Sequence, residues 1–354
     1  MILDCLEKVL RQETLTEEEA AAALAEILSG EASPVQASAL LVALAMRGES
    51  EAELLGMARV LRGQTRLVSQ YGPAEVGLCH SERKLLLPQL LSGVAAAGEV
   101  GPAPFDIFSA VAFVVAGAGV HVLAQSWRSA NSDLESAGVL EALGIRTQIP
   151  AGQIARGVVE VGLGFVLEPL VREAMSCFHF ADREVPVPTA FHLLLPLLNP
   201  GGAPALVVGV YSARMTETVA RVVARLGVRR AFVFHGSDGL DVISNTGPTT
   251  LIEIENGQTN VRRIEPGDFG LPVGRLDELT GGDASQCAAV IRSILQGAAG
   301  PRRQVVLLNA APAIVCGGKD RDLAEGVQKA AAAIDSGRAL QALQNLARFT
   351  HQTS

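Results

Sequence analysis

Residues 105–144 constrain the fold of this chain more than any other segment. The segment opens with an apolar run rich in small residues, 110–118, which is long enough for a buried helix. A β-branched stretch, residues 120–123, follows a Gly-x-Gly break and predicts a short buried strand. After a polar loop, an amphipathic pattern over residues 134–143 predicts a second helix, which ends at Gly144. Helix, strand, loop and helix in this order predict one half of a doubly wound α/β sheet.

The polar loop at residues 124–132 is where we expect this segment to bind a ligand. In open α/β sheets, ligands collect in the loops that leave the carboxyl ends of the strands. The loop carries many groups that can form hydrogen bonds or ion pairs, namely Gln125, Ser126, Arg128, Ser129, Asn131 and Ser132.

The length of 354 residues predicts two or three domains, or one large α/β unit with a smaller partner. The formal charge is −8 and the isoelectric point about 5.4, so the overall field repels nucleic acid and acidic membranes. The five cysteines lie far apart without metal-ligand spacing, which is typical of reduced thiols in a cytoplasmic protein. The apolar runs fall short of the roughly 18 residues that a membrane-spanning helix requires, so we expect no membrane partner.

Residues 1–68 are predicted to form four short helices. Apolar residues recur at steps of three and four, so each helix has one face to bury. A bundle this small rarely folds alone, and we expect it to pack on the larger domain or on a second copy of the chain. The helix starts are marked by Thr16 with Glu19, by Ser33 with Pro34, and by Ser50 with Glu53.

The second half of the chain has a clear β-α-β pattern. Residues 205–210 and 230–235 predict buried strands, and residues 216–226 predict an amphipathic helix between them, so the two strands should be parallel. Residues 250–263 predict an antiparallel hairpin that turns at Asn256-Gly257.

Five further motifs occur in order along the chain. They are Leu-Thr-Glu-Glu-Glu-Ala at residues 15–20, Ala-Leu-Ala-Met-Arg-Gly-Glu at 43–49, Leu-Glu-Ala-Leu-Gly at 140–144, Phe-His-Leu-Leu-Leu-Pro-Leu-Leu-Asn-Pro at 191–200 and His-Gly-Ser-Asp-Gly-Leu-Asp-Val-Ile-Ser at 235–244. Together they resemble the anthranilate phosphoribosyltransferase family, which is itself similar to the pyrimidine nucleoside phosphorylases. The resemblance implies an α/β fold with two domains. A small N-terminal helical domain, residues 1–68 joined by about 165–190, would accompany a large domain, residues 69–354, whose mainly parallel sheet is flanked by helices and carries the ligand cleft.

The resemblance also implies a function. In this family, phosphoribosyl pyrophosphate loses its pyrophosphate to an aromatic amine, anthranilate, in tryptophan biosynthesis. Magnesium bridges the pyrophosphate to the protein, and the helical domain makes a homodimer contact. By resemblance, Asp241 is the candidate magnesium ligand, and the candidate substrate-binding residues are Gly98, Ser109, Arg128, Ser129, Ser132, Arg183 and His192.

The chain departs from the family at several functional positions. Asp106 stands for an Asn of the family, His192 replaces another Asn, and residues 124–127 replace Lys-His-Gly-Asn. Val242 stands where the family has a Glu beside the magnesium-binding Asp241. A single carboxylate, with waters and substrate phosphates, binds Mg²⁺ weakly, so we expect magnesium binding to be weak or lost.

Two more segments bear on substrate binding. Direct counting places Asp182 where the family has the arginine that holds the anthranilate carboxylate, with Arg183 beside it. The family's phosphate loop, Gly-Thr-Gly-Gly-Asp, has two alternative counterparts: residues 80–83, or residues 96–100, which include Gly98. Neither has the glycines that let backbone N–H groups approach a phosphate. Each contains a glutamate, and like charges about 4 Å apart cost roughly 4 kcal/mol at an effective dielectric constant of about 20.

These replacements argue against the family's usual reaction and leave three functions open. The first is pentosyl transfer to an aromatic amine or another acceptor through the retained contacts. The second is a non-catalytic or regulatory relative that binds a small ligand, with Trp127 either filling space in the cleft or stacking on a ring. The third is nucleic-acid binding, which the net charge of −8 opposes.

Overall fold

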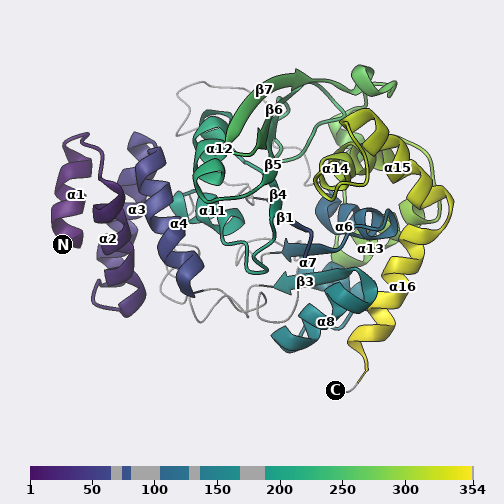
Figure 1. Ribbon diagram of the computed structural model, residues 1–354, viewed down its shortest axis with the longest axis horizontal. Coiled ribbons are helices and arrows are strands. Elements are labelled where there is room, and N and C mark those ends of the chain that lie inside the picture. The colour runs from purple at the N-terminus through teal and green to yellow at the C-terminus, as the bar shows by residue number, and fades with distance from the viewer. Residues whose placement is uncertain (65–73, 81–103, 127–135, 168–187, 353–354) are drawn as a thin grey trace.

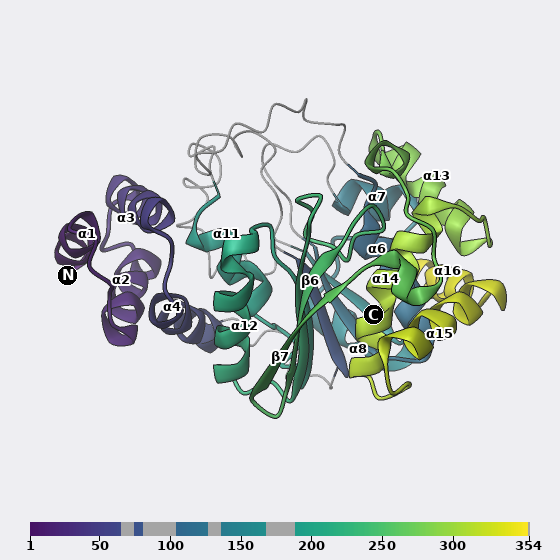
Figure 2. The same cartoon turned by 90° about the horizontal axis from the view of Figure 1, so that it is seen from above.

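The computed structural model describes residues 1–64, 74–80, 104–126, 136–167 and 188–352. In these ranges a bundle of helices lies beside a seven-stranded sheet, and further helices cover both faces of the sheet (Figure 1, Figure 2). This confirms the predicted fold class, an N-terminal helical part and a large α/β part with a mainly parallel sheet. Of the helices in the described ranges, none has both the length and the hydropathy needed to cross a membrane.

The N-terminal bundle has the four predicted helices. Thr16 Oγ1 accepts a hydrogen bond from the Glu19 N–H at 3.2 Å, and a capping box of the same kind starts the next helix at Ser33. Ser50 and Glu53 form a third reciprocal pair. Each box satisfies two backbone donors that a helix start leaves without a partner, which is why the sequence located these ends. The helices are α1 (Ile2–Leu10), α2 (Glu17–Ser29), α3 (Pro34–Arg47) and α4 (Glu51–Gln64).

The sheet has the strand order β3-β2-β1-β4-β5-β6-β7. The first five strands in this order run parallel, and the last two form the predicted antiparallel hairpin, turned at Asn256-Gly257, where both residues have a positive φ. The strands are β1 (Val76–His80), β2 (Val122–Ser126), β3 (Leu163–Leu167), β4 (Ala205–Gly209), β5 (Arg230–Gly236), β6 (Thr249–Glu255) and β7 (Gln258–Ile264).

The helices outside the bundle fall into two groups (Figure 2). The C-terminal helices and α6 cover one face of the sheet, while α11 and α12 lie on the face next to the bundle. They are α6 (Ile107–Gly117), α7 (Ser136–Ala142), α8 (Ala151–Val161), α11 (Ala190–Leu194), α12 (Thr216–Arg225), α13 (Ala284–Leu295), α14 (Pro301–Cys316), α15 (Leu323–Asp335) and α16 (Arg338–Thr350), with the short 3₁₀ turns η2 (Leu195–Leu197), η3 (Ala213–Met215), η4 (Pro266–Phe269) and η5 (Leu276–Leu279).

Two apolar cores lie on the two faces of the sheet. Successive side chains of a strand point to opposite faces. In β4, Ala205 and Val207 accordingly belong to one core, and Leu206 and Val208 to the other. The sheet is therefore buried on both faces, as expected of parallel strands with helical crossovers.

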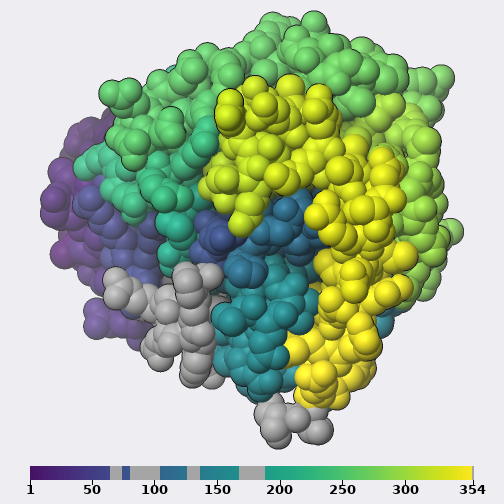
Figure 3. All heavy atoms as spheres, turned by 45° about the vertical axis from the view of Figure 1, so that its right-hand side comes forward, coloured from purple at the N-terminus to yellow at the C-terminus, as the bar shows by residue number. Residues whose placement is uncertain are grey.

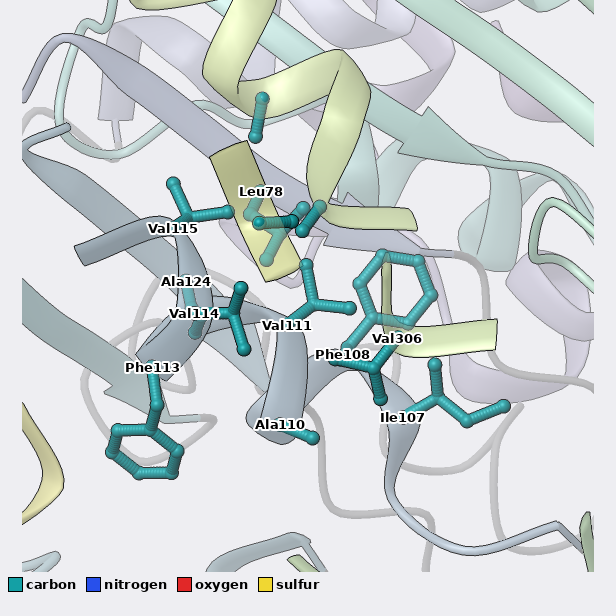
Figure 4. Packing of buried hydrophobic residues seen from close by; sticks show 14 of the residues in the cluster. Leu78, Ile107, Phe108, Ala110, Val111, Phe113, Val114, Val115, Ala124 and Val306 are labelled. Atoms are coloured by element: carbon teal, nitrogen blue, oxygen red, sulfur yellow. The ribbon is translucent and has the colours of Figure 1, made fainter. Parts of the chain in front are cut away.

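Helix α6 is buried on all sides. Of its 11 residues, all but Ala116 are buried. Leu78 of β1, Ala124 of β2 and Val306 of α14 surround Val111 and its neighbours on α6 (Figure 4). A helix that is apolar all round belongs in the interior, so the run at residues 110–118 is confirmed as a core helix.

The bundle packs on the large domain, as predicted. Its buried residues share one apolar core with the sheet face that α12 covers. Arg62 of α4 donates to the carbonyl oxygens of Leu197 and Leu226, at 2.6 and 3.1 Å, and Arg225 of α12 pairs with Glu17 and Glu51 of the bundle. Apolar contact and ion pairs thus hold the two parts together.

The structure corrects the predicted start of the polar loop. The strand predicted at residues 120–123 is β2, at Val122–Ser126, so residues 124–126 belong to the sheet. Gln125 is buried, and its Nε2 donates to the Leu195 carbonyl at 3.3 Å. Because the side-chain amide has a hydrogen-bond acceptor that is distant in sequence, a polar residue can lie near the end of this buried strand.

Candidate functional site

The candidate site lies at the carboxyl ends of the five parallel strands, which here are simply called the strand ends or this edge of the sheet. The chain runs outward from β1 through β2 to β3 and then places β4 on the other side of β1. Ligands in open α/β sheets bind outside the point where the strand order reverses, here between β1 and β4. The ends of the five strands are His80, Ser126, Leu167, Gly209 and Gly236.

Three of the predicted site residues belong to this edge. Ser109 lies in the first turn of α6, which precedes a parallel strand and so begins at the edge where the strands end. Asp241 follows β5, and His192 lies one turn before Leu195, whose carbonyl contacts the end of β2. The structure therefore places Ser109, His192 and Asp241 toward the carboxyl ends of the parallel strands.

Ser109 is bonded to the residue that caps its helix. Its N–H donates to Asp106 Oδ1 at 3.0 Å, and its hydroxyl donates to Asp106 Oδ2 at 2.6 Å. A helix N-terminus attracts anions because its first N–H groups lack partners inside the helix. Here the Asp106 carboxylate already takes two donors and adds a negative charge, so the start of α6 is a poorer phosphate site than it would be with asparagine.

The loop after β5 is built around Asp238. One carboxylate oxygen of Asp238 accepts from the Leu240 N–H at 3.1 Å, and the other accepts from the hydroxyls of Ser244 and Thr246 at 2.5 and 2.8 Å. Because the three bonds lie within the loop, Asp238 stabilises the loop itself. Asp241 lies between these bonded positions and is partly exposed.

Asp241 and Val242 differ in their surroundings. Val242 is 3% exposed and belongs to the apolar core with Ile243. In the part of the chain that the structure describes, no three histidine, cysteine or acidic side chains lie close enough to hold a metal ion. A single carboxylate with waters and substrate phosphates is a donor set that Mg²⁺ accepts, and Asp241 is the residue here that could supply it.

His192 is buried at the start of α11. Its Nδ1 accepts a hydrogen bond from the Thr189 N–H at 3.2 Å, and its ring meets Phe191 edge-on. The side chain is 4% exposed and caps the helix from inside the fold. The capping role accounts for the position of His192, and its predicted role in substrate binding stays a prediction.

A buried glutamate near the end of β4 was missed by sequence reasoning. Glu49, between α3 and α4, is 7% exposed, and burial raises the pKa of its carboxyl to about 7. Tyr211, two residues beyond β4, is close enough for Glu49 to add to the rise that burial causes in the pKa of the Tyr211 phenol. Arg47 and Arg214 are the cations near Glu49. A glutamate between a glycine and a capping serine gave no sign of burial in the sequence.

Most of the remaining predictions fall on segments outside the described residues. Both counterparts of the phosphate loop lie there, apart from His80, which ends β1. The same holds for Trp127 and for five of the predicted substrate-binding residues, Gly98, Arg128, Ser129, Ser132 and Arg183.

A small hollow lies beside Leu163 at the start of β3, at the amino ends of the parallel strands. Phe165 and Phe349 line it, and Gln153 Nε2 donates to the carbonyls of Phe349 and Gln352 at 3.3 Å. Figure 3 shows the C-terminal segment (yellow) against the segment that contains α8 (teal). The hollow contains none of the predicted site residues.

Comparisons with known proteins agree with this architecture. Residues 3–64 match the glycosyl transferase family helical bundle domain, and residues 92–340 match the α/β domain of the same family. The anthranilate phosphoribosyltransferase of Pelotomaculum thermopropionicum is 41% identical over 354 residues, which cover 100% of this chain and 98% of the relative. The chain belongs to the anthranilate phosphoribosyltransferase family.

Other members of the anthranilate phosphoribosyltransferase family give the same result. The Geobacter sulfurreducens protein of that name is 40% identical and covers 99% of this chain and 100% of its own length. The crystal structure of the Thermus thermophilus enzyme has a TM-score of 0.87 at 32% identity and covers 99% of this chain and 100% of its own. The Saccharomyces cerevisiae enzyme in complex with PRPP and Mg has a TM-score of 0.83 over 99% and 97% of the two chains, and at 21% identity it supports the fold alone.

Proposed function

We propose that this chain is a phosphoribosyltransferase that works more slowly than its anthranilate-using relatives. It would bind phosphoribosyl pyrophosphate (PRPP) at the carboxyl edge of the sheet and transfer the pentosyl group to an aromatic amine, anthranilate, as in tryptophan biosynthesis. One observation carries this proposal: Asp241 remains partly exposed at that edge, in a loop whose other carboxylate and core residues hold it in place. Family membership supports the choice of reaction.

Asp241 is the proposed magnesium ligand. The relative from Saccharomyces cerevisiae is described with PRPP and Mg, and one carboxylate with substrate phosphates is a donor set that Mg²⁺ accepts. Bound there, the ion would neutralise charge on the leaving pyrophosphate. With Val242 in the core, a second carboxylate ligand is missing at this position, so we expect weak magnesium binding.

The remaining substrate contacts are proposed from the family motifs. Ser109 is held by Asp106, whose charge opposes a phosphate at the start of α6, so PRPP should bind less tightly than an asparagine would allow. The other proposed contacts are Gly98, Arg128, Ser129, Ser132, Arg183 and His192.

We also propose that the chain has two domains and is a homodimer. Residues 1–68, joined by about 165–190, would form the helical domain, and residues 69–354 the α/β domain. Neighbouring helices α1 and α3 expose large apolar side chains: Leu3 and Leu10 are 59% and 66% exposed, and Val35 and Met46 are 78% and 72% exposed. Exposed apolar side chains on two neighbouring helices favour contact with a second copy. Free, buried cysteines among the described residues fit the expected cytoplasmic location.

The proposed reaction is tested by following the fluorescence of anthranilate with PRPP and Mg²⁺. We expect slow loss of the signal with the natural chain, and no loss with Asp241→Asn, which removes the charged ligand but keeps the side-chain shape. Equal rates for the two proteins would contradict the assigned role of Asp241.

A second function, ligand binding without turnover, is favoured by the position of Val242 in the core and by the carboxylate at Asp106. It predicts PRPP binding without consumption of anthranilate or of other aromatic amines. Nucleic-acid binding remains the least supported function because the net charge is −8.

A further inference from the structure

The segment that carries Asp241 is held by a side chain of α14, 66 residues further along the sequence from Ile243. Asn309 lies in α14 and is 1% exposed. Its Oδ1 accepts from the Ile243 N–H at 2.8 Å, and its Nδ2 donates to the Ile243 carbonyl at 2.8 Å. Nδ2 also donates to the Val305 carbonyl at 2.8 Å, one turn earlier in the helix.

The orientation of the Asn309 amide follows from its partners. The Ile243 N–H can only donate, so Oδ1 must face it, and the two carbonyls can only accept, so both must meet Nδ2. Both backbone groups of Ile243 thus pair with one side chain in the apolar core. Without that side chain, the N–H and the carbonyl of Ile243 would be buried without hydrogen-bond partners. The loop could regain partners for them only by moving.

Gly209 holds the same segment from the sheet. Gly209 is the last residue of β4, and a Cβ built on it would overlap the carbonyl oxygen of Asp241. Its φ is not in the positive range, so conformation does not demand glycine. Glycine is required because the Asp241 backbone comes so close, and any side chain at this position would push that backbone away from β4.

We propose that Asn309 and Gly209 are positioning residues that fix the backbone around Asp241 and so set where its carboxylate lies. Asn309 fixes Ile243, two residues after Asp241; Gly209 lets the Asp241 carbonyl rest on the sheet. On the amino side, the Gly236 N–H donates to the Leu240 carbonyl at 2.9 Å. Asp241 is therefore held before, at and after its own position. This inference rests on the proposed role of Asp241 as a magnesium ligand.

The first test needs no ligand. In Asn309→Leu and Gly209→Ala, amide hydrogen exchange of residues 236–248, measured by mass spectrometry, should be at least about tenfold faster than in the natural protein. Two matched controls should stay within about twofold. Leu308→Ala shortens a buried neighbour on α14, and in Gly77→Ala the added Cβ would come closest to the end of the Leu206 side chain, at 2.6 Å. Unchanged exchange in both test variants would overturn the inference.

The second test separates positioning from mere packing. With PRPP present, the Mg²⁺ concentration needed for half-maximal PRPP binding should rise by at least about tenfold in Asn309→Leu and Gly209→Ala and stay unchanged in the controls. Faster exchange with an unmoved Mg²⁺ midpoint would also overturn the inference, since the contacts would then serve stability alone. If the natural chain binds no PRPP, the proposed function fails, and the exchange comparison alone decides whether these residues hold the loop.

Discussion

Replacing Glu49 by glutamine should stabilise the protein in a way that depends on pH. Glu49 is 7% exposed, its Oε1 has no hydrogen-bond partner among the residues that the structure describes, and burial is the largest cause of its raised pKa. Repulsion from Glu53 adds to the rise, while Arg47 and Arg214 offset part of it. Glutamine keeps the shape of the side chain and removes the charge that the interior disfavours.

The magnitude follows from the difference between the two pKa values of Glu49. The folded-state pKa is about 7, against an ordinary value of 4.5. Because the folded state holds its proton more tightly, the folded protein loses stability as the pH rises through this window. At about 1.4 kcal/mol per pH unit, the penalty reaches about 3 kcal/mol above pH 7 and vanishes below the unfolded-state value. Glu49→Gln removes this penalty.

The assay is urea unfolding of the natural chain and of Glu49→Gln at several pH values from 4.5 to 8, followed by circular dichroism. The free energies of unfolding should be similar at the acidic end, and the variant should be more stable by up to about 3 kcal/mol at pH 8. Glu217→Gln is the matched control, because Glu217 is 66% exposed in its pair with Arg221. If Glu49→Gln gains nothing over the control between pH 5 and 8, the carboxylate is not buried in the way described.

Three further predictions concern the site, the proposed dimer and the core. Asp106→Asn keeps a good helix cap and removes a negative charge at the start of α6, so PRPP should bind about tenfold more tightly in calorimetry, with thermal stability nearly unchanged. Met46→Lys should convert a dimer to a monomer in size-exclusion chromatography with light scattering, whereas Val159→Lys, an exposed position on α8, should not. Phe113→Ala empties a core site beside Phe165, at a ring distance of 5.7 Å, and should lower the free energy of unfolding by about 3–5 kcal/mol in urea titrations.

The sequence predicted most elements whose causes are local. Capping boxes at Thr16 and Ser33 fixed helix starts because both partners of each bond lie within four residues. The Asn256-Gly257 turn and the apolar run of α6 were equally clear, since positive φ and all-round burial leave direct marks in the sequence. The burial of β4 and β5 followed from their apolar, β-branched runs, and their parallel pairing followed from the β-α-β pattern.

What the sequence could not predict depends on partners far apart in the chain. Gln125 was assigned to a loop because it is polar. The hydrogen bond that lets it lie in a buried strand goes to the Leu195 carbonyl, which is 70 residues away and leaves no local pattern. The Asn309 contact with Ile243 spans 66 residues, and the need for glycine at Gly209 appears only when the loop after β5 folds back on β4. Glu49 is buried because the bundle meets the end of β4, a contact that no local pattern encodes.

The most direct test of the proposed function is a calorimetric titration of the natural chain with PRPP, with and without Mg²⁺. We expect binding in the micromolar range that requires Mg²⁺ and is lost in both Asp241→Asn and Arg128→Ala. Absence of measurable heat, or binding that neither Mg²⁺ nor these substitutions change, would contradict it.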